Sequence, residues 1–245
     1  MLSTLLLFLA GPMQSWGTRS RFTERDTGLE PSKSGVIGLL CAAMAIARTT
    51  PVDAPGCNLA GLRMGVRIDQ EGVMRRDYHT AGGGGLGIAR ADGSHGKDAV
   101  VSDRYYLADA QFLVGLEGED EALVNRIQAA LVAPVWQLSL GRKAFVPSVP
   151  VHLADGLQIG IPLKQALEGF RWPVSPLCPL KHQPATTKPD PLRLALEITF
   201  NDTPTANALV EVRMDQPEGA AFQTRAFRTR RVLTDYCTPN SHKEA

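Results

Sequence analysis

Cysteine is scarce in this 245-residue chain, and the four that occur lie far apart. Cys41, Cys57, Cys178 and Cys237 show none of the paired spacings that bind a metal ion. A protein built around a cysteine-bound metal is therefore not indicated. We expect reduced thiols in a cytoplasmic protein, where a free cysteine fills apolar space like any small hydrophobic side chain, and we expect no cofactor.

An excess of charge is also missing, because 26 Lys and Arg oppose 25 Asp and Glu and leave a formal net charge of +1. This balance argues against a protein that coats nucleic acid through bulk charge, so any RNA site must be a local patch. No apolar run approaches the roughly 18 residues of a membrane span. The apolar stretch at 2–10 is short, lacks a basic leader and precedes Gly11 and Pro12, which favours a buried first strand over a signal peptide.

Catalytic motifs are missing as well. The chain has no Gly-x-Ser-x-Gly nucleophile elbow, no His-x-x-x-His pair and no phosphate-binding loop ending in Gly-Lys-Ser/Thr. Residues 77–80 (DYHT) do place an acid, a phenol and an imidazole in a row. Neighbours on a strand point to opposite faces, so at most two of these side chains can share a site. We therefore expect a protein without enzymatic activity.

Hydrophobic periodicity predicts an α+β protein, since 44% hydrophobic residues can bury a real core. We expect, in chain order, a strand at 3–9, a helix at 34–47, a half-buried strand at 62–69, a strand from a turn at Gly72 through Tyr78, a strand at 105–116 and a helix at 119–131. This order is typical of the β-α-β-β-α-β arrangement, in which two helices cover one face of an antiparallel sheet. The opposite face would be free to meet a ligand.

Glycine and proline divide the rest of the chain. The segment between Thr80 and Arg104 contains seven glycines and few apolar residues, so it cannot build a core and should project. Prolines become frequent after Lys143 and interrupt long elements until 192–200. We expect a first domain at 1–145 with the insertion at about 80–104, and a β-rich extension of short strands at 146–245 that packs on it.

A polar motif follows the first strand. Residues 11–17 read GPMQSWG, and this mixture of glycine, an amide and an indole can place Gln14 and Trp16 beside a base or a phosphate. A purely structural turn is the alternative.

A second motif precedes the first helix. Residues 31–35 read PSKSG, so Ser32 or Ser34 can cap the helix while free amides and Lys33 face an anion. Helix caps without a ligand are more common, and both interpretations stay open.

The densest basic cluster lies near the C-terminus. Arg225, Arg228, Arg230 and Arg231 are followed by no acid until Asp235, and strand alternation would set Arg228 and Arg230 on one face. A solvated strand edge and a contact to phosphate are both open, so the role of this cluster is undecided.

Five segments together resemble a known family. In chain order they are 11–17 (GPMQSWG), 31–40 (PSKSGVIGLL), 76–80 (RDYHT), 104–110 (RYYLADA) and 140–143 (LGRK). Each is weak by itself, but the set in this order resembles the fifth Cas family of the RAMP proteins, in the form found in the type I-E CRISPR Cascade complex. The resemblance covers most of the first 150 residues and thins beyond them.

The resemblance implies a ferredoxin-like, RRM-like domain with a thumb-like insertion. It also implies a non-catalytic subunit that grips and caps the 5′ handle of the guide RNA (crRNA), contacts the neighbouring backbone subunits and the large subunit, and meets target DNA only through the complex. Carried onto the matching positions, RNA contact falls on Gln14, Trp16, Lys33, Ser34, Tyr78, His79, Arg104, Arg142 and Lys143, with Arg90 and Lys97 in the insertion as weaker candidates.

Two alternatives stay open. Relatives of type I-C use the corresponding subunit to cut repeat RNA, and Tyr78, His79 or Lys33 could act in such a metal-independent endoribonuclease. The nearly neutral charge and the many glycines also allow a pure assembly scaffold, whose thumb binds proteins rather than RNA.

Overall fold

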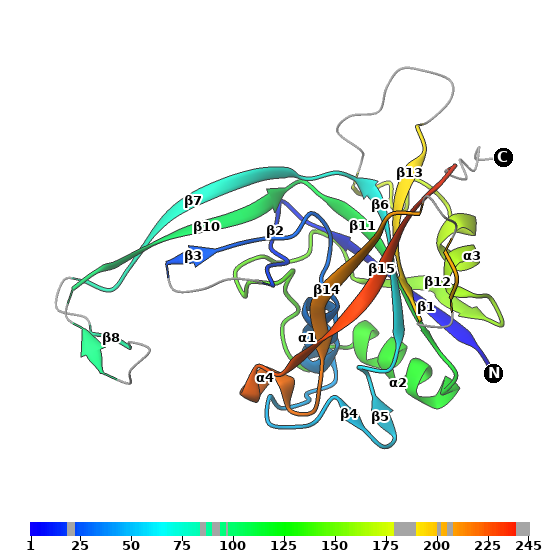
Figure 1. Ribbon diagram of the computed structural model, residues 1–245, viewed down its shortest axis with the longest axis horizontal. Coiled ribbons are helices and arrows are strands. Elements are labelled where there is room, and N and C mark those ends of the chain that lie inside the picture. The colour runs from blue at the N-terminus through cyan, green and yellow to red at the C-terminus, as the bar shows by residue number, and fades with distance from the viewer. Residues whose placement is uncertain are drawn as a thin grey trace.

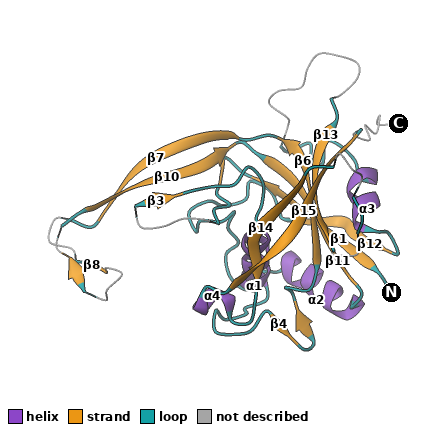
Figure 2. Ribbon diagram, in the orientation of Figure 1, coloured by secondary structure: helices purple, strands orange, loops and turns teal. Residues whose placement is uncertain are grey.

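The computed structural model describes residues 1–18, 23–83, 87–89, 94–96, 98–178, 190–199, 202–204 and 208–238. Its elements are β1 (Ser3–Ala10), β2 (Met13–Gln14), β3 (Glu24–Arg25), α1 (Lys33–Ala43), β4 (Asp53–Ala54), β5 (Cys57–Asn58), β6 (Arg63–Gln70), β7 (Val73–Ala81), β8 (Ile88–Ala89), β9 (His95–Gly96), β10 (Val100–Ala108), β11 (Gln111–Gly118), α2 (Glu121–Val132), β12 (His152–Ile159), α3 (Leu163–Gly169), β13 (Leu192–Ile198), β14 (Val210–Pro217), α4 (Ala221–Thr224) and β15 (Phe227–Cys237). Figures 1 and 2 show a sheet-rich α+β protein with few helices.

The main sheet has seven antiparallel strands in the order β12-β1-β11-β6-β13-β15-β14. All eight residues of β1 are buried, because helices pack against both faces of the sheet around it. Leu5, Leu7 and Leu9 join the core shared with α1 and α2, whereas Leu6 and Phe8 join the core beneath α3. Each of these side chains contributes about 1.5–3 kcal/mol when it is fully buried. Because side chains of β1 alternate between the two faces of the sheet, this one strand stabilises the packing of helices on both faces.

The expectation of a free sheet face is wrong. α3 covers that face, and Leu163 and Leu167 lie so close that a Cβ added at Gly65 or Gly115 would come within 2.8 and 2.6 Å of them. The fully buried guanidinium of Arg67 donates to the carbonyls of Leu167 and Phe170, which fixes the end of α3 to β6. β6 is therefore buried on both faces rather than half-buried.

Both predicted helices form, with shifted ends. The hydroxyl of Ser32 accepts from the Gly35 amide at the start of α1, and the carboxylate of Asp120 accepts from the Leu123 amide at the start of α2. α1 ends at Ala43 instead of residue 47, because the chain turns at Ala45, which has φ of 56°. Ser32, not Ser34, is therefore the capping residue.

The projecting insertion is longer than expected. β7 and β10 pair along nine residues each, and Figure 1 shows them leaving the body as one long arm with β8 at its tip, where β9 pairs with β8. The strand expected at 105–116 is interrupted at Asp109, where φ is 60°, so that β10 belongs to the arm and β11 to the main sheet. β3 pairs in parallel with the middle of β10, at Asp103 and Arg104, and widens the sheet of the arm there.

The C-terminal strands lengthen the main sheet instead of forming a layer on it. β13 pairs with β6, and β15 extends over 11 residues, so these strands are not the short ones that the prolines predict. β12 pairs with β1 at the other edge. Strands from both sides of residue 145 therefore share one sheet. Among the described helices, none is both long and apolar enough to cross a membrane.

Replacing Leu167 by Ala tests whether α3 seals the second face. Leu167 is fully buried, so Leu167→Ala should lower the free energy of unfolding, measured in urea, by about 2–5 kcal/mol. The matched control Leu177→Ala removes a side chain that is 77% exposed, and its effect should stay within about 0.5 kcal/mol. Equal effects of the two changes would contradict the burial of this face.

Candidate nucleic-acid interface

A cleft of about 800 Å³ opens where segments far apart in the chain meet around one side of α1. The described residues that line it include five cations and a single carboxylate, namely Arg25, Arg48, Arg142, Lys143, Arg225 and Asp26. Ion pairs between described residues involve none of these five cations. In a chain whose net charge is only +1, the cleft is thus the local basic patch that an RNA site requires.

Close backbone contacts bring the predicted motifs together in this cleft. The Ser15 amide donates to the Leu140 carbonyl at 3.0 Å, which joins the GPMQSWG segment to the LGRK segment. Gly141 has φ of +90°, and a Cβ there would lie 1.7 Å from the Ser15 carbonyl oxygen, so this position requires glycine. Gly35 contacts the ring of Trp16 in the same way, with a Cβ distance of 2.9 Å. Three motifs scattered over 130 residues therefore form one wall.

Gln14 and Trp16, which were expected to contact RNA, support this wall from inside with buried side chains. The Gln14 amide donates to the carbonyls of Leu9 at 3.3 Å and Ala110 at 2.7 Å, and its oxygen accepts from the Trp16 indole at 3.1 Å. Trp16 is only 1% exposed. Both side chains are therefore buried and bonded within the protein, and they hold the shape of the wall.

Lys33, whose ammonium was expected to contact a phosphate, is also buried, at 1% exposure. Its Nζ donates to Glu197 at 2.9 Å, and its backbone amide donates to the carboxylate of Asp215 at 2.7 Å. Burial lowers the pKa of Lys33, and the neighbouring Glu197 opposes this effect. Ser34, by contrast, is partly exposed and lines the cleft.

Arg230 belongs to the same buried network, whereas the other arginines of the C-terminal cluster lie in different environments. Its guanidinium donates to both oxygens of Asp215, at 2.6 and 2.9 Å. Burial acts against the charged carboxylate of Asp215, but the hydrogen bonds and charge of Arg230 bring its pKa below the ordinary value. Arg228 is instead exposed and pairs with Glu218, and only Arg225 of the cluster lines the cleft.

Arginines converge where the cleft meets the base of the arm. The guanidinium of Arg142 donates to the carbonyls of Arg25 at 3.1 Å and Tyr105 at 2.8 Å. Arg104 on β10 lies opposite Arg25 in the register of β3. Burial and the nearby charge of Arg104 lower the pKa of Arg142. The charges of Asp77 and Asp26 oppose this effect without reversing it. Since like charges brought together are unfavourable until an anion neutralises them, the junction is suited to a phosphate.

Tyr78 and His79 lie on the arm and do not line the cleft. His79 approaches Asp77, with 3.3 Å between Nδ1 and Oδ2, on one face of β7, whereas Tyr78 projects from the other face and is 67% exposed. The expected division of these side chains between two faces is confirmed. Arg90 and Lys97 lie outside the described residues.

Several residues that line the cleft were not predicted from the sequence. Arg25, Arg48 and Trp136 stand alone in loops or in a two-residue strand, without periodicity or a motif around them. The one available signal was for Trp136, which lies four residues before the LGRK segment.

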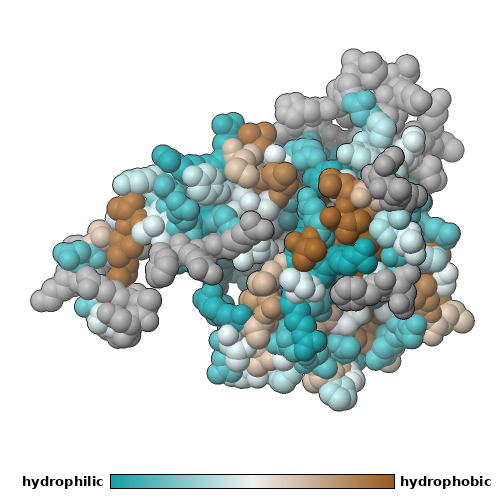
Figure 3. Space-filling view, viewed as in Figure 1, coloured by the Kyte–Doolittle hydropathy of each residue, from teal (hydrophilic) through white to brown (hydrophobic). Residues whose placement is uncertain are grey.

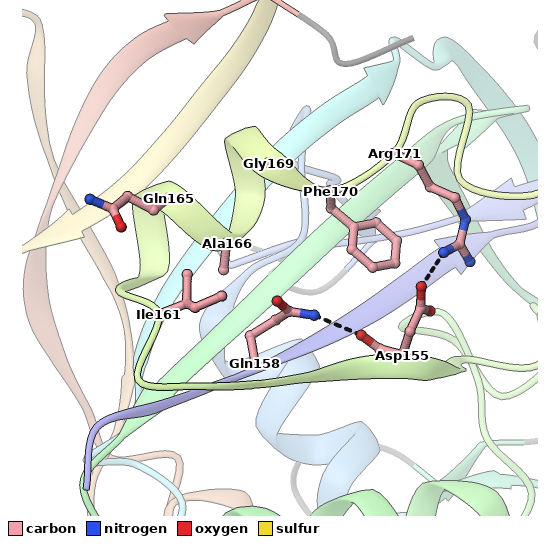
Figure 4. A pocket seen from close by; sticks show the side chains of 8 residues that line it. All are labelled: Asp155, Gln158, Ile161, Gln165, Ala166, Gly169, Phe170 and Arg171. Atoms are coloured by element: carbon pink, nitrogen blue, oxygen red, sulfur yellow. Dashed lines mark hydrogen bonds and ion pairs between the residues drawn. The ribbon is translucent and has the colours of Figure 1, made fainter. Parts of the chain in front are cut away.

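A second depression, of about 340 Å³, lies between β12 and α3 (Figure 4). Its two charged residues, Arg171 and Asp155, pair with each other, and the amide of Gln158 donates to the Asp155 carbonyl. Arg171 also lies over the Phe170 ring, 4.6 Å from its centroid. Because this depression leaves no lining charge unmatched, the cation-lined cleft is the better candidate for an anionic ligand.

Comparison with known proteins places this α+β protein among the proteins of CRISPR systems. A family model described as CRISPR-associated protein (Cas_Cas5) matches residues 4–233. The chain belongs to this family, as the five sequence segments indicated.

Individual relatives agree with the family. The chain is 32% identical over 165 residues to the CRISPR system Cascade subunit CasD of Escherichia coli (strain K12), which covers 62% of this chain and 71% of that protein. A solved structure titled "Crystal structure of Cas protein" is 41% identical with a TM-score of 0.70, covering 96% of this chain and 95% of the other. A chain of a "CRISPR RNA-guided surveillance complex" is 33% identical with a TM-score of 0.72, covering 96% and 90%.

Removing Asp215 tests the buried network behind the cleft. Asp215→Ala leaves the guanidinium of Arg230 buried without its main partner, so the free energy of unfolding at neutral pH should fall by about 3–5 kcal/mol. The folded pKa of Asp215 lies below the ordinary value of about 3.9, so its stabilisation is complete above that pH and is lost as the pH falls through the folded pKa. The difference from the unchanged protein should therefore shrink in acid.

The double variant with Arg230→Met provides the control. If the two groups act as one pair, the double variant should be less destabilised than the sum of the single changes. Additive losses, or a loss from Asp215→Ala that is unchanged in acid, would contradict the network.

Proposed function

We propose that this protein binds the 5′ handle of a guide RNA within a CRISPR RNA-guided surveillance complex, and that it holds the RNA without cutting it. The observation that carries the proposal is the cleft with five cations and one carboxylate in a chain of nearly zero net charge. The relatives support it, since one is a Cascade subunit and another is part of an RNA-guided surveillance complex.

The cleft provides the groups that single-stranded RNA needs. Phosphates are bound by guanidinium and ammonium groups, and unpaired bases stack on aromatic rings. Arg142 and Lys143 supply charge from one wall, Arg48 and Arg225 from others, and the hydroxyl of Ser34 adds a polar group at the start of α1. From the cleft, the strand would pass Arg104 toward the arm.

We also propose that the body has a ferredoxin-like core. The elements β1, α1, β6, β11, α2 and β12 follow one another as β-α-β-β-α-β, and their four strands are neighbours in the order β12-β1-β11-β6. The arm is then an insertion between the second and third strands of this core. β13, β15 and β14 extend it from the edge strand β6.

Contacts with neighbouring backbone and large subunits belong to the same proposal. Figure 3 shows hydrophobic side chains along the arm and on the surface of the C-terminal hairpin, which is formed by β14 and β15. The exposed large side chains of the hairpin and its surroundings are Leu209, Val212, Met214 and Tyr236, and the exposed hydrophobic side chains of the arm are Val73, Met74, Val100 and Val101. Exposed apolar groups of this kind mark protein contacts. Target DNA would meet the protein only through the assembled complex.

Binding without cleavage is favoured over the endoribonuclease alternative. His79 and Asp77 are solvent-exposed on the arm, Tyr78 projects from the other face, and the ammonium of Lys33 is buried against Glu197. The side chains imagined for acid–base chemistry thus point to three different surroundings. A general acid and base must both reach the same 2′-hydroxyl and its leaving group.

Lowering the charge of the cleft should reduce the salt dependence of RNA binding. For single strands, the slope of log affinity against log salt concentration is about −0.7 per neutralised phosphate. Lys143→Ala and Arg48→Ala should each make the slope shallower by about 0.7. Lys164→Ala, a control on α3 across the sheet, should leave it unchanged. The proposal fails if all three variants keep the slope of the unchanged protein.

Incubation of the purified protein with repeat RNA and a metal chelator tests the absence of cleavage. We expect RNA that stays bound and keeps its length on a denaturing gel. A defined product that disappears in His79→Ala would instead establish the endoribonuclease.

A further inference from the structure

Trp136 differs from the other aromatic residues of the cleft. It lines the cation-lined cleft and is 48% exposed, whereas Trp16 in the same cleft is 1% exposed. Tryptophan has the largest side chain and is highly buried on average, so half an indole left in solvent has a cost in free energy. Such exposure is understandable where a ligand covers the ring.

The backbone beneath this indole is fixed. The Val135 amide donates to the Ala43 carbonyl at 3.0 Å, and the Trp136 amide donates to the Ala42 carbonyl at 3.1 Å. These carbonyls belong to the last turn of α1, where the helix itself supplies no partner. These two hydrogen bonds fix the backbone of the loop to the end of α1, so the exposed ring of Trp136 is attached to an ordered backbone.

The cleft that Trp136 lines also holds polar groups for a nucleotide. Gln137 and Ser139 follow Trp136 in the chain and offer an amide and a hydroxyl, and Arg48 contributes a positive charge. Phe222 also lines the cleft, and a Cβ added at Gly38 would lie 3.6 Å from its ring. An aromatic face beside cations and neutral polar groups is the combination that holds an unpaired base together with its phosphate.

We propose that Trp136 is the stacking platform for one unpaired base of the bound RNA. This inference rests on the proposed function and adds to it the residue that recognises a base rather than the backbone. A protein contact is the competing use, because Val132 and Val135 nearby are also exposed. RNA is favoured because Trp136 lines the cation-rich cleft, whereas those two valines do not.

Abasic nucleotides test the stacking directly. The probe is the small RNA that co-purifies with the complex, resynthesised with one abasic nucleotide at a time along its 5′ end. Binding of each RNA is measured with the full-length protein, with Trp136→Ala, with Trp136→Phe, and with Val135→Ala as the matched control beside it.

We expect one abasic position to weaken binding by the unchanged protein about 5- to 150-fold, the range that corresponds to 1–3 kcal/mol per stacked base. Trp136→Ala should lose affinity for intact RNA by the same factor and lose nothing more at that position. Trp136→Phe should retain most of the affinity. The salt slope of Trp136→Ala should not change, because no phosphate contact is removed.

Three results would overturn the inference. If the unchanged protein binds RNA with the expected salt slope but no abasic position is coupled to Trp136, stacking is refuted while the proposed function stands. If Trp136→Ala binds RNA normally and loses a neighbouring subunit instead, the indole is a protein contact. If the unchanged protein binds no RNA at all, the proposed function fails and this inference fails with it.

Discussion

The cleft depends on the packing of Trp16 against glycine. The indole is enclosed between the buried amide of Gln14 and the Cα of Gly35, and the adjacent carbonyl of Ser15 meets Gly141 at a distance that no side chain would allow. Because the packing of protein interiors is dense, the loss of either glycine would push the LGRK segment or the start of α1 away from the first strand. The cations of the cleft would then no longer face one another.

Charge in this protein is divided between two kinds of environment. Cations inside the fold are paired, as Arg67 is with Asp69 and Arg230 with Asp215. Cations of the cleft have no ion-pair partner among the described residues. Since a buried charge is tolerated only when it is paired, the first set stabilises the fold. The second set, at the surface, retains its attraction for an anion.

Sequence reasoning was most successful where local patterns determine the structure. The helices at α1 and α2 and the strands β1 and β6 follow from periodicity and capping, and the five segments identified the family. It failed where distant segments decide. No residue near Lys33 in the sequence predicts that Glu197 and Asp215 will pair with it and that it will be buried.

The second helical layer was missed for a similar reason. α3 has only seven residues in a proline-rich region, so its periodicity is too short to reveal that it covers the sheet. The arm was placed correctly in the chain but judged too short, because strand pairing between β7 and β10 is a long-range interaction. Loop residues such as Arg48 and Trp136 can be recognised as candidates only in the structure, where they line the cleft.

Photo-crosslinking of the guide RNA within the assembled complex, with the adducts mapped by mass spectrometry, tests the central claim most directly. If the cleft holds the 5′ end of the RNA, adducts of its first nucleotides should fall on residues 136–143 and near Arg48 and Arg25. Adducts confined to the surface of α3, which covers the other face of the sheet, would contradict the account.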